Sequence, residues 1–143
     1  MQSTCGAHEL LYWDVAQGRQ MLSSQDCVEG DTKWQTSTCD LGFSVMGIWA
    51  PGQDGTDINT VHVRPSKLDT GRCGGIVATG DDFGKLKFFN YPCVVRNAPA
   101  VTCKGHSSHV MTCKWLDGEE GDKESLIGTT GGNDCCAIVW RVQ

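Results

Sequence analysis

Three features of the sequence predict an all-β fold. Runs in which apolar and polar residues alternate, as in half-buried strands, recur between turns rich in Gly, Asp and Asn. The C-terminal part contains Gly105-His106, then Thr130 and Asp134, and a Trp six residues after that Asp. This order is typical of a four-stranded WD-repeat blade. Because a blade takes about 40–45 residues, we expect the 143 residues to form about three blades of an incomplete β-propeller.

Residues 105–143 are predicted to form the last blade, which is expected to lack its outer strand. The imidazole of His106 can bridge the Asp134 carboxylate and the Thr130 hydroxyl, and this hydroxyl can accept the indole N–H of Trp140. We therefore expect these four residues to form a structural tetrad with no catalytic role. Strands are expected at 110–116 and, on both sides of a turn at Asp134, within 126–141.

Residues 1–42 are predicted to form an incomplete first blade, so that the chain begins part-way through it. The segment His8–Asp14 ends in a literal Trp-Asp and is expected to be a strand, preceded by the end of another strand within Ser3–Ala7. Residues 33–39 alternate large and small side chains, and we expect the outer strand of this blade there.

Residues 43–104 are predicted to form the second blade. Its first part, 45–57, changes from bulky apolar residues to turn residues, which predicts a long connecting loop with an exposed aromatic residue, Trp49. Four later segments are expected to be strands: 58–64, 75–79, 85–90 and 101–104.

The second blade also repeats the spacing of the last one. Thr79 stands ten residues before Phe89, just as Thr130 stands ten before Trp140. Because a Phe replaces the indole, we expect the tetrad to be incomplete in this blade and an Asp to hold the turn alone.

The composition argues against several classes of partner. The formal net charge is −5, and no run of Lys or Arg supplies the phosphate-neutralising surface of a nucleic-acid-binding protein. No segment reaches the roughly 18 apolar residues of a membrane span, and the first residues lack the parts of a signal peptide. We therefore expect neither nucleic acid nor membrane as a partner. The nine Cys residues, an odd number without a regular framework, are expected to be reduced thiols.

Several motifs carry a family resemblance: Gly52-Gln-Asp-Gly-Thr-Asp-Ile-Asn59, Ala78-Thr-Gly-Asp-Asp-Phe-Gly-Lys85, Tyr91-Pro-Cys93 and His106-Ser-Ser-His-Val110. Two segments within them, Asp54-Gly-Thr-Asp-Ile-Asn59 and Asp81-Asp-Phe-Gly-Lys85, are not general WD-repeat features. Through them, nearly the whole chain resembles the echinoderm microtubule-associated protein-like family, at the C-terminal end of that family's second propeller. The resemblance implies a non-catalytic interaction module that binds tubulin or microtubules, in the cytoplasm and cytoskeleton. A generic WD-repeat scaffold for another protein partner is the alternative.

Six residues are candidates for contact with such a partner. Phe43 and Trp49 are either aromatic anchors of the kind enriched in binding hot spots or part of a loop tucked against its own blade. The other four candidates are Asp residues in turns, where they can also serve as turn caps: Asp54, Asp57, Asp81 and Asp82.

Two chemical sites, a zinc site and a hydrolase site, are alternatives to this interpretation. Four residues are of the types that bind zinc: Cys103, His106, His109 and Cys113. However, the tetrad needs His106, and the two Cys residues are expected on different blades. The turn carboxylates can be drawn as a hydrolase site, yet no nucleophile, base and orienting group stand in a recognisable order. We therefore expect no enzyme activity, no metal and no cofactor.

The two incomplete blades are expected to leave unpaired strand edges, which can pair with another chain. Two copies joined tail to head, with the last blade of one borrowing a strand from the other, would close a ring of about six blades. A homo-oligomer is therefore a further hypothesis.

Overall fold

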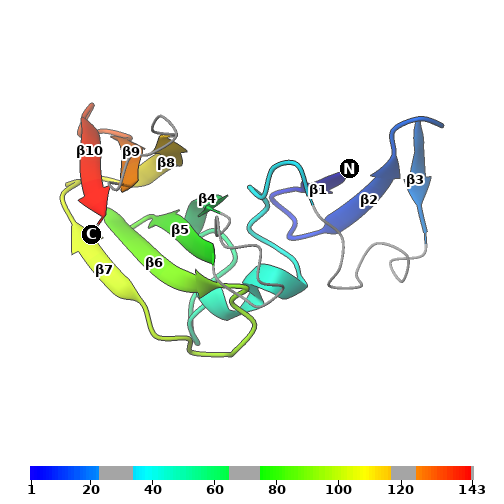
Figure 1. The fold of residues 1–143 in the computed structure, drawn as a ribbon, viewed down its shortest axis with the longest axis horizontal. Coiled ribbons are helices and arrows are strands. Elements are labelled where there is room, and N and C mark those ends of the chain that lie inside the picture. Colours follow the sequence, from blue (N-terminus) through cyan, green and yellow to red (C-terminus); the bar gives the residue numbers. More distant parts are fainter. Residues whose placement is uncertain (23–33, 65–74, 117–124, 143) are drawn as a thin grey trace.

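The computed structural model describes residues 1–22, 34–64, 75–116 and 125–142 of the chain. These residues form ten β-strands and one short 3-10 helix, and the strands make three separate antiparallel sheets (Figure 1). This architecture confirms the predicted all-β fold of blade-like sheets. Among the described residues, no helix has the length and apolar character needed to cross a membrane.

Sheet 1 is built from the first residues of the chain. Its strands follow in sequence order: β1 (Gln2–Thr4), β2 (Leu10–Asp14) and β3 (Arg19–Met21). The Asp14 carboxylate accepts the backbone N–H groups of Ala16 and Gln17, at 3.1 and 3.2 Å, which closes a tight turn and lets β3 pair directly with β2. The outer strand predicted at 33–39 is wrong. The described part of that segment, 34–39, contains no strand, because β3 already fills this edge of the sheet.

Sheets 2 and 3 contain the strands predicted for the second and last blades, with boundaries shifted by a few residues. Sheet 2 has the spatial order β4 (Ile58–Arg64), β5 (Gly75–Asp81), β6 (Lys85–Tyr91) and β7 (Val101–Lys104). Sheet 3 has the order β8 (Val110–Leu116), β9 (Ser125–Gly131) and β10 (Ala137–Val142).

Sheets 2 and 3 repeat the same pairing pattern. In each sheet, the register between the first and second strands shifts just after the first residue of the first strand. After this shift, Thr79 on β5 pairs with Val61 on β4. At the equivalent position of sheet 3, Thr129 on β9 pairs with Cys113 on β8. The two sheets are therefore structural repeats that can be compared residue by residue.

Sheet 3 packs face to face against sheet 2. A buried cluster joins the two sheets: Ala78, Leu86, Cys113, Trp115 and Ile127. Polar contacts fix the alignment, because the backbone N–H of Trp115 donates to His62 Nδ1 at 2.8 Å and its indole N–H donates to the His62 carbonyl at 3.1 Å. A slip of one residue in either strand would break both hydrogen bonds.

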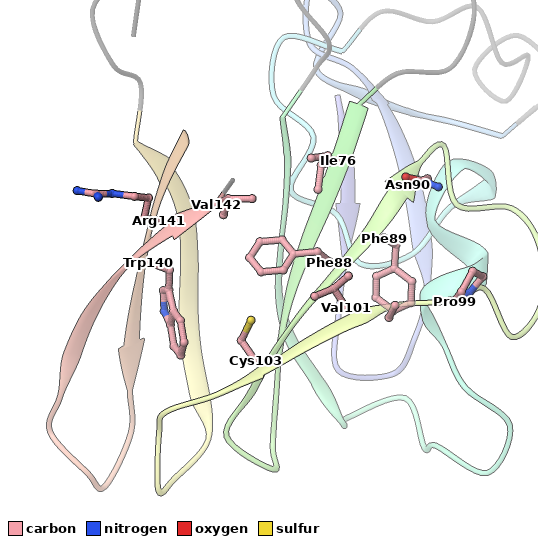
Figure 2. A pocket seen from close by; sticks show the side chains of 11 residues that line it. Ile76, Phe88, Phe89, Asn90, Pro99, Val101, Cys103, Trp140, Arg141 and Val142 are labelled. Carbon is pink, nitrogen blue, oxygen red and sulfur yellow. The ribbon is translucent and has the colours of Figure 1, made fainter. Parts of the chain in front are cut away.

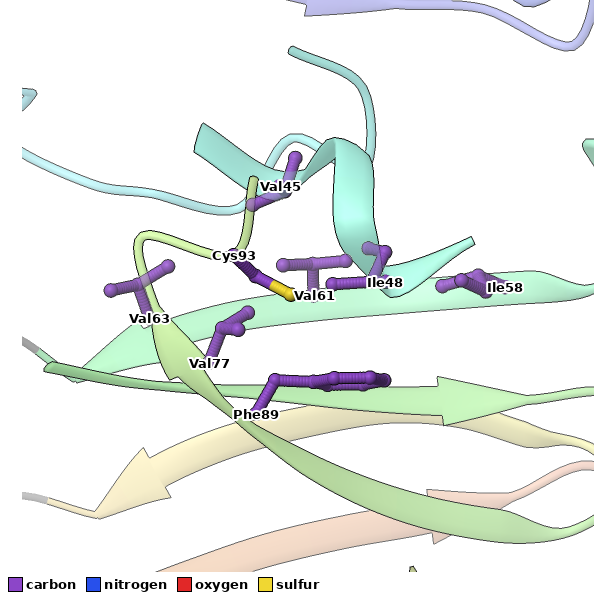
Figure 3. Packing of buried hydrophobic residues seen from close by; sticks show 8 residues of the cluster. All are labelled: Val45, Ile48, Ile58, Val61, Val63, Val77, Phe89 and Cys93. Atoms are coloured by element: carbon purple, nitrogen blue, oxygen red, sulfur yellow. The ribbon is translucent and has the colours of Figure 1, made fainter. Parts of the chain in front are cut away.

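A short helix, η1 (Phe43–Ile48), covers the opposite face of sheet 2. Val45 and Ile48 of this helix are buried against apolar side chains that alternate along β4, β5 and β6. Figure 3 shows the cluster they form: Val45, Ile48, Ile58, Val61, Val63, Val77, Phe89 and Cys93.

The position of η1 corrects the prediction of a long loop at 45–57. The backbone N–H of Gly47 donates to the Cys93 carbonyl at 2.7 Å, so the helix is tied to the chain that leaves sheet 2. A Cβ at Gly47 would lie 2.4 Å from the Val95 carbonyl oxygen, so only glycine permits this close approach. The bulky apolar residues of this segment are a buried helix face because sheet 2 offers them a place to pack.

Candidate functional site

Four side chains at one end of sheet 3 form a chain of hydrogen bonds. The indole N–H of Trp140 on β10 donates to the Thr129 hydroxyl on β9 at 2.8 Å. This hydroxyl also lies 2.8 Å from His106 Nε2, and His106 Nδ1 lies 2.9 Å from Asp134 Oδ2. Because a carboxylate can only accept, the N–H at His106 Nδ1 donates to Asp134. A Cβ at Gly105 would lie 2.6 Å from the Trp140 ring, which explains the glycine before the histidine.

Asp134 ties the loop before β8 to the turn between β9 and β10. Besides His106, it accepts the backbone N–H groups of Ser107 at 3.1 Å and Cys136 at 3.2 Å. Burial alone would raise the pKa of Asp134, but these hydrogen bonds outweigh it and hold the pKa below its ordinary value. The carboxylate is therefore ionised at neutral pH, and all its contacts are to the protein's own loops.

The tetrad hydroxyl belongs to Thr129, and the choice of Thr130 from the sequence is wrong. Thr129 is 2% exposed, whereas Thr130 lies on the exposed face of β9, because neighbouring strand residues point to opposite faces. The physical reason is the length of the turn. Thr79 stands ten residues before Phe89 in sheet 2, but the β9–β10 turn is one residue longer, which puts Thr129 eleven residues before Trp140.

Sheet 1 keeps part of the same arrangement. The indole N–H of Trp13 donates to the Ser3 hydroxyl at 2.8 Å, as that of Trp140 does to Thr129. The literal Trp-Asp at the end of β2 thus marks a position equivalent to Trp140 in sheet 3.

In sheet 2, Asp81 holds the β5–β6 turn by hydrogen bonds. This corrects the prediction that Asp81 is a candidate contact with a partner. The side chain is fully buried. One carboxylate oxygen accepts the backbone N–H groups of Phe83 at 3.0 Å and Lys85 at 2.9 Å, and the other lies 2.9 Å from Lys87 Nζ. Because no part of Asp81 reaches the surface, it cannot contact a partner.

Three other candidate carboxylates, Asp54, Asp57 and Asp82, lie together at the surface, and we call them the acidic rim. The backbone links them, because the N–H of Asp57 donates to the Asp54 carbonyl at 3.2 Å and that of Asp82 donates to the Asp57 carbonyl at 2.9 Å. Asp82 Oδ1 also accepts the Asn59 amide at 2.7 Å and lies 3.1 Å from His109 Nδ1. The structure therefore brings the loop before β4, the β5–β6 turn and the residue before β8 to one rim.

The acidic rim is anionic and carries an exposed aromatic residue. The hydroxyl and backbone N–H of Thr56, at 2.6 and 2.8 Å, hold the pKa of Asp54 below its ordinary value. Phe83 follows Asp82 in the β5–β6 turn and is 63% exposed. Phe83 was not among the candidates predicted from the sequence, although a large aromatic residue in a tight turn of Asp and Gly was the available signal.

The two aromatic candidates behave differently. The indole N–H of Trp49 donates to the Asp40 carbonyl at 2.9 Å, and its ring packs against the core cluster under η1. Trp49 is therefore partly buried, which favours the alternative of a segment tucked against its own blade over a fully exposed anchor. Phe43, at the start of η1, is 60% exposed and stays a candidate contact.

An apolar groove with a volume of about 580 Å³ lies between the outer strands of sheets 2 and 3. Figure 2 shows the side chains that line it. Phe88 and Val101 line it from sheet 2, and Trp140 lines it from sheet 3. The groove could not be predicted from the sequence, because it forms only where β7 and β10, from different blades, come close together.

The proposed zinc ligands lie in different environments. His106 belongs to the tetrad, and His109 contacts Asp82. Burial raises the pKa of the Cys113 thiol to about 11, so it stays protonated at neutral pH and is a poor metal ligand. Within the described ranges, no group of three or more His, Cys, Asp or Glu side chains is placed to hold a metal ion.

Comparison with known proteins identifies the blades. The chain matches, over residues 1–142, the family model described as the echinoderm microtubule-associated protein second beta-propeller. The chain belongs to this family. The three sheets are therefore blades of the family's second propeller, as the sequence resemblance predicted.

Relatives in the echinoderm microtubule-associated protein family are similar over almost the whole chain. Echinoderm microtubule-associated protein-like 2 of Rattus norvegicus is 41% identical over 98% of this chain and 20% of the relative. The human protein of the same name is 42% identical over 96% of this chain and 19% of its own length. The 77 kDa echinoderm microtubule-associated protein of Strongylocentrotus purpuratus is 41% identical over 99% of this chain and 19% of its own length. The chain thus spans about a fifth of the length of these relatives.

Proposed function

We propose that this chain is a non-catalytic protein-interaction module that binds tubulin or microtubules. Membership of the echinoderm microtubule-associated protein family is the observation that supports this function, because the names of the relatives describe microtubule-associated proteins. A cytoplasmic, cytoskeletal location follows from the same proposal. The tetrad and the Asp81 turn have structural roles, so the contact surface must be sought among exposed loops.

The acidic rim is the surface we propose for the contact. The Asp54 and Asp82 carboxylates accept hydrogen bonds from Thr56 and Asn59, respectively, so these two side chains lose little conformational entropy when a partner docks. Exposed carboxylates favour a cationic patch on the partner, and Phe83 beside them supplies an aromatic anchor. Phe43, on η1 and outside the acidic rim, is the alternative anchor if the contact lies elsewhere.

Cosedimentation with polymerised tubulin tests this proposal. The wild-type chain is expected to pellet with the polymer, and to do so less at high salt because exposed charges are screened. Joint replacement of Asp54, Asp57 and Asp82 by Asn is expected to weaken binding by about tenfold or more. Phe83→Ala should weaken it as well.

Phe43→Ala is the matched control, since Phe43 and Phe83 are exposed to almost the same extent, 60% and 63%. Loss of binding in Phe43→Ala alone would place the contact on η1 instead of the acidic rim. Absence of the wild-type chain from the pellet at any salt concentration would contradict tubulin binding by this chain. The alternative, a scaffold for another protein partner, would then be favoured.

A further inference from the structure

The turn between β9 and β10 carries two neighbouring thiols that take no part in the tetrad. Cys135 and Cys136 are both free and both exposed. They are the only adjacent pair among the nine Cys residues of the sequence. Reagents in solution can therefore reach both sulfur atoms, whereas the Cys113 thiol is buried.

Both thiols are directed back along the turn. In a regular strand, neighbouring side chains point to opposite faces, which would keep two thiols apart. Cys135 has a φ of 51°, in the left-handed region, and β10 begins only at Ala137, so this alternation does not apply to the pair. The Sγ of Cys135 lies 3.8 Å from the Asn133 carbonyl oxygen, and the Sγ of Cys136 lies 3.0 Å from the Asp134 carbonyl oxygen. The two sulfur atoms thus lie near the same stretch of backbone.

A disulfide between adjacent residues is strained and therefore easily reduced. Neighbouring Cα atoms are about 3.8 Å apart across a trans peptide bond, whereas most disulfides join Cα atoms that are about 4.4–6.8 Å apart. Such strain raises the reduction potential, which is typical of labile, regulatory disulfides and not of structural ones. A bond between Cys135 and Cys136 would therefore form under oxidising conditions and be lost when a thiol reductant is present.

We propose that Cys135 and Cys136 form a modification site at which a hydroperoxide oxidises the two thiols to a vicinal disulfide. In the first step, one thiolate attacks the terminal oxygen of the hydroperoxide and the O–O bond breaks. The sulfur becomes a sulfenic acid, and the alkoxide that leaves takes up the proton released by the thiol. The second sulfur then attacks the sulfenic sulfur, so that the S–S bond forms, the S–O bond breaks, and hydroxide leaves as water with the second thiol's proton. The pair loses two electrons and two protons, and the hydroperoxide is reduced to an alcohol and water.

The same turn holds the tetrad carboxylate, so oxidation of the pair is coupled to the tetrad. The backbone N–H of Cys136 donates to Asp134 Oδ1 at 3.2 Å, and the Cys136 carbonyl accepts the Gly131 N–H at 2.8 Å. A ring closed through Cys135 and Cys136 contains the peptide bond between them, and the N–H of this bond is the donor to Asp134. Closure of the ring therefore displaces a donor that fixes the turn. The site does not depend on tubulin binding and lies outside the acidic rim.

Peptide mass spectrometry of the purified, reduced chain tests the site. The chain is treated with hydrogen peroxide, from which both products are water, its remaining thiols are alkylated, and it is digested with trypsin. Cleavage after Lys123 and Arg141 gives a peptide whose only Cys residues are Cys135 and Cys136. This peptide is expected to carry no alkyl group and to be lighter by two hydrogen atoms than its reduced, unalkylated form. Excess dithiothreitol should restore two thiols that can be alkylated.

Cys136→Ser is the matched control, because Ser is close to Cys in size but cannot form the bond. In this variant, dimedone should trap the sulfenic acid of Cys135. Cys5, which is exposed and has no Cys neighbour in the sequence, reports whether the peroxide reaches exposed thiols. Recovery of both Cys135 and Cys136 as alkylated thiols, under peroxide that oxidises Cys5, would overturn the proposal. So would a disulfide that links either residue to another Cys or to another chain.

Urea denaturation tests the coupling to the tetrad. The unfolding midpoint of the oxidised wild type is expected to lie below that of the reduced wild type, because a hydrogen bond to Asp134 is weakened. The midpoint should return after reduction, and peroxide should change the midpoint of Cys136→Ser less. Equal midpoints for the oxidised and reduced wild type would overturn the coupling.

Discussion

The Thr129 hydroxyl is the centre of the tetrad, and Thr129→Val removes it with little change in side-chain size. The substitution leaves two groups without their hydrogen-bond partner, the indole N–H of Trp140 and Nε2 of His106. Because Thr129 is only 2% exposed, water cannot readily take the place of the hydroxyl. The variant should therefore fold less stably while it keeps the same sheets.

The expected loss follows from the two unsatisfied groups. A buried polar group left without a partner costs about 1–3 kcal/mol. Since Trp140 is only partly buried, we expect a decrease in the free energy of unfolding of about 2–4 kcal/mol for the two groups together. With a urea dependence of about 2 kcal/mol per M for a chain of this size, the midpoint of unfolding should fall by about 1–2 M.

Urea denaturation followed by tryptophan fluorescence and circular dichroism measures this change. Thr130→Val is the matched control, because it makes the same substitution at the next residue, which is exposed. Its effect is expected to lie within about 0.5 kcal/mol. Equal losses in the two variants, or a larger loss in Thr130→Val, would refute the assignment of the tetrad hydroxyl to Thr129.

Three further predictions concern buried charges and thiols. Asp81→Asn should lower the free energy of unfolding by about 3 kcal/mol, because it removes one partner of a buried ion pair. Asp82→Asn should change the free energy of unfolding little. The urea midpoints of the two variants measure this difference. The folded-state pKa of Asp134 is below its ordinary value, so the stability that the ionised carboxylate contributes is present above about pH 4 and is lost as the pH falls further. The urea midpoint of Asp134→Asn should therefore depend less on pH in that range than the midpoint of the wild type. A thiol reagent should label the exposed Cys135 in the folded chain and leave Cys113, with its raised pKa, unlabelled, as mass spectrometry would show.

Much of the fold was accessible from local patterns. Alternation of apolar and polar residues located the strands of sheets 2 and 3, and the literal Trp-Asp located β2. The motifs around Asp57 and Asp82 were sufficient for the family resemblance, which the comparison confirmed. These signals are local, so they can be read without knowledge of which strands meet.

The candidate site could be predicted only in part. His106, Asp134 and Trp140 come together as expected, but the hydroxyl between them is that of Thr129. The spacing to the Trp depends on the length of one turn, and turn length is set by how the strands on either side pair. A sequence pattern that counts residues cannot detect one additional residue in the turn.

By itself, the sequence determined that this chain makes antiparallel blades of a known family, because strand alternation and turn residues are encoded over a few neighbouring positions. Only the tertiary structure decided which side chains are available to a partner. Asp81 and Asp82 are neighbours in one turn, yet one is buried against Lys87 and the other lies on the acidic rim. Trp49 is partly buried against the core cluster because η1 packs on sheet 2, a contact between distant segments. Exposure depends on what lies against a residue in space, and a linear sequence does not state that.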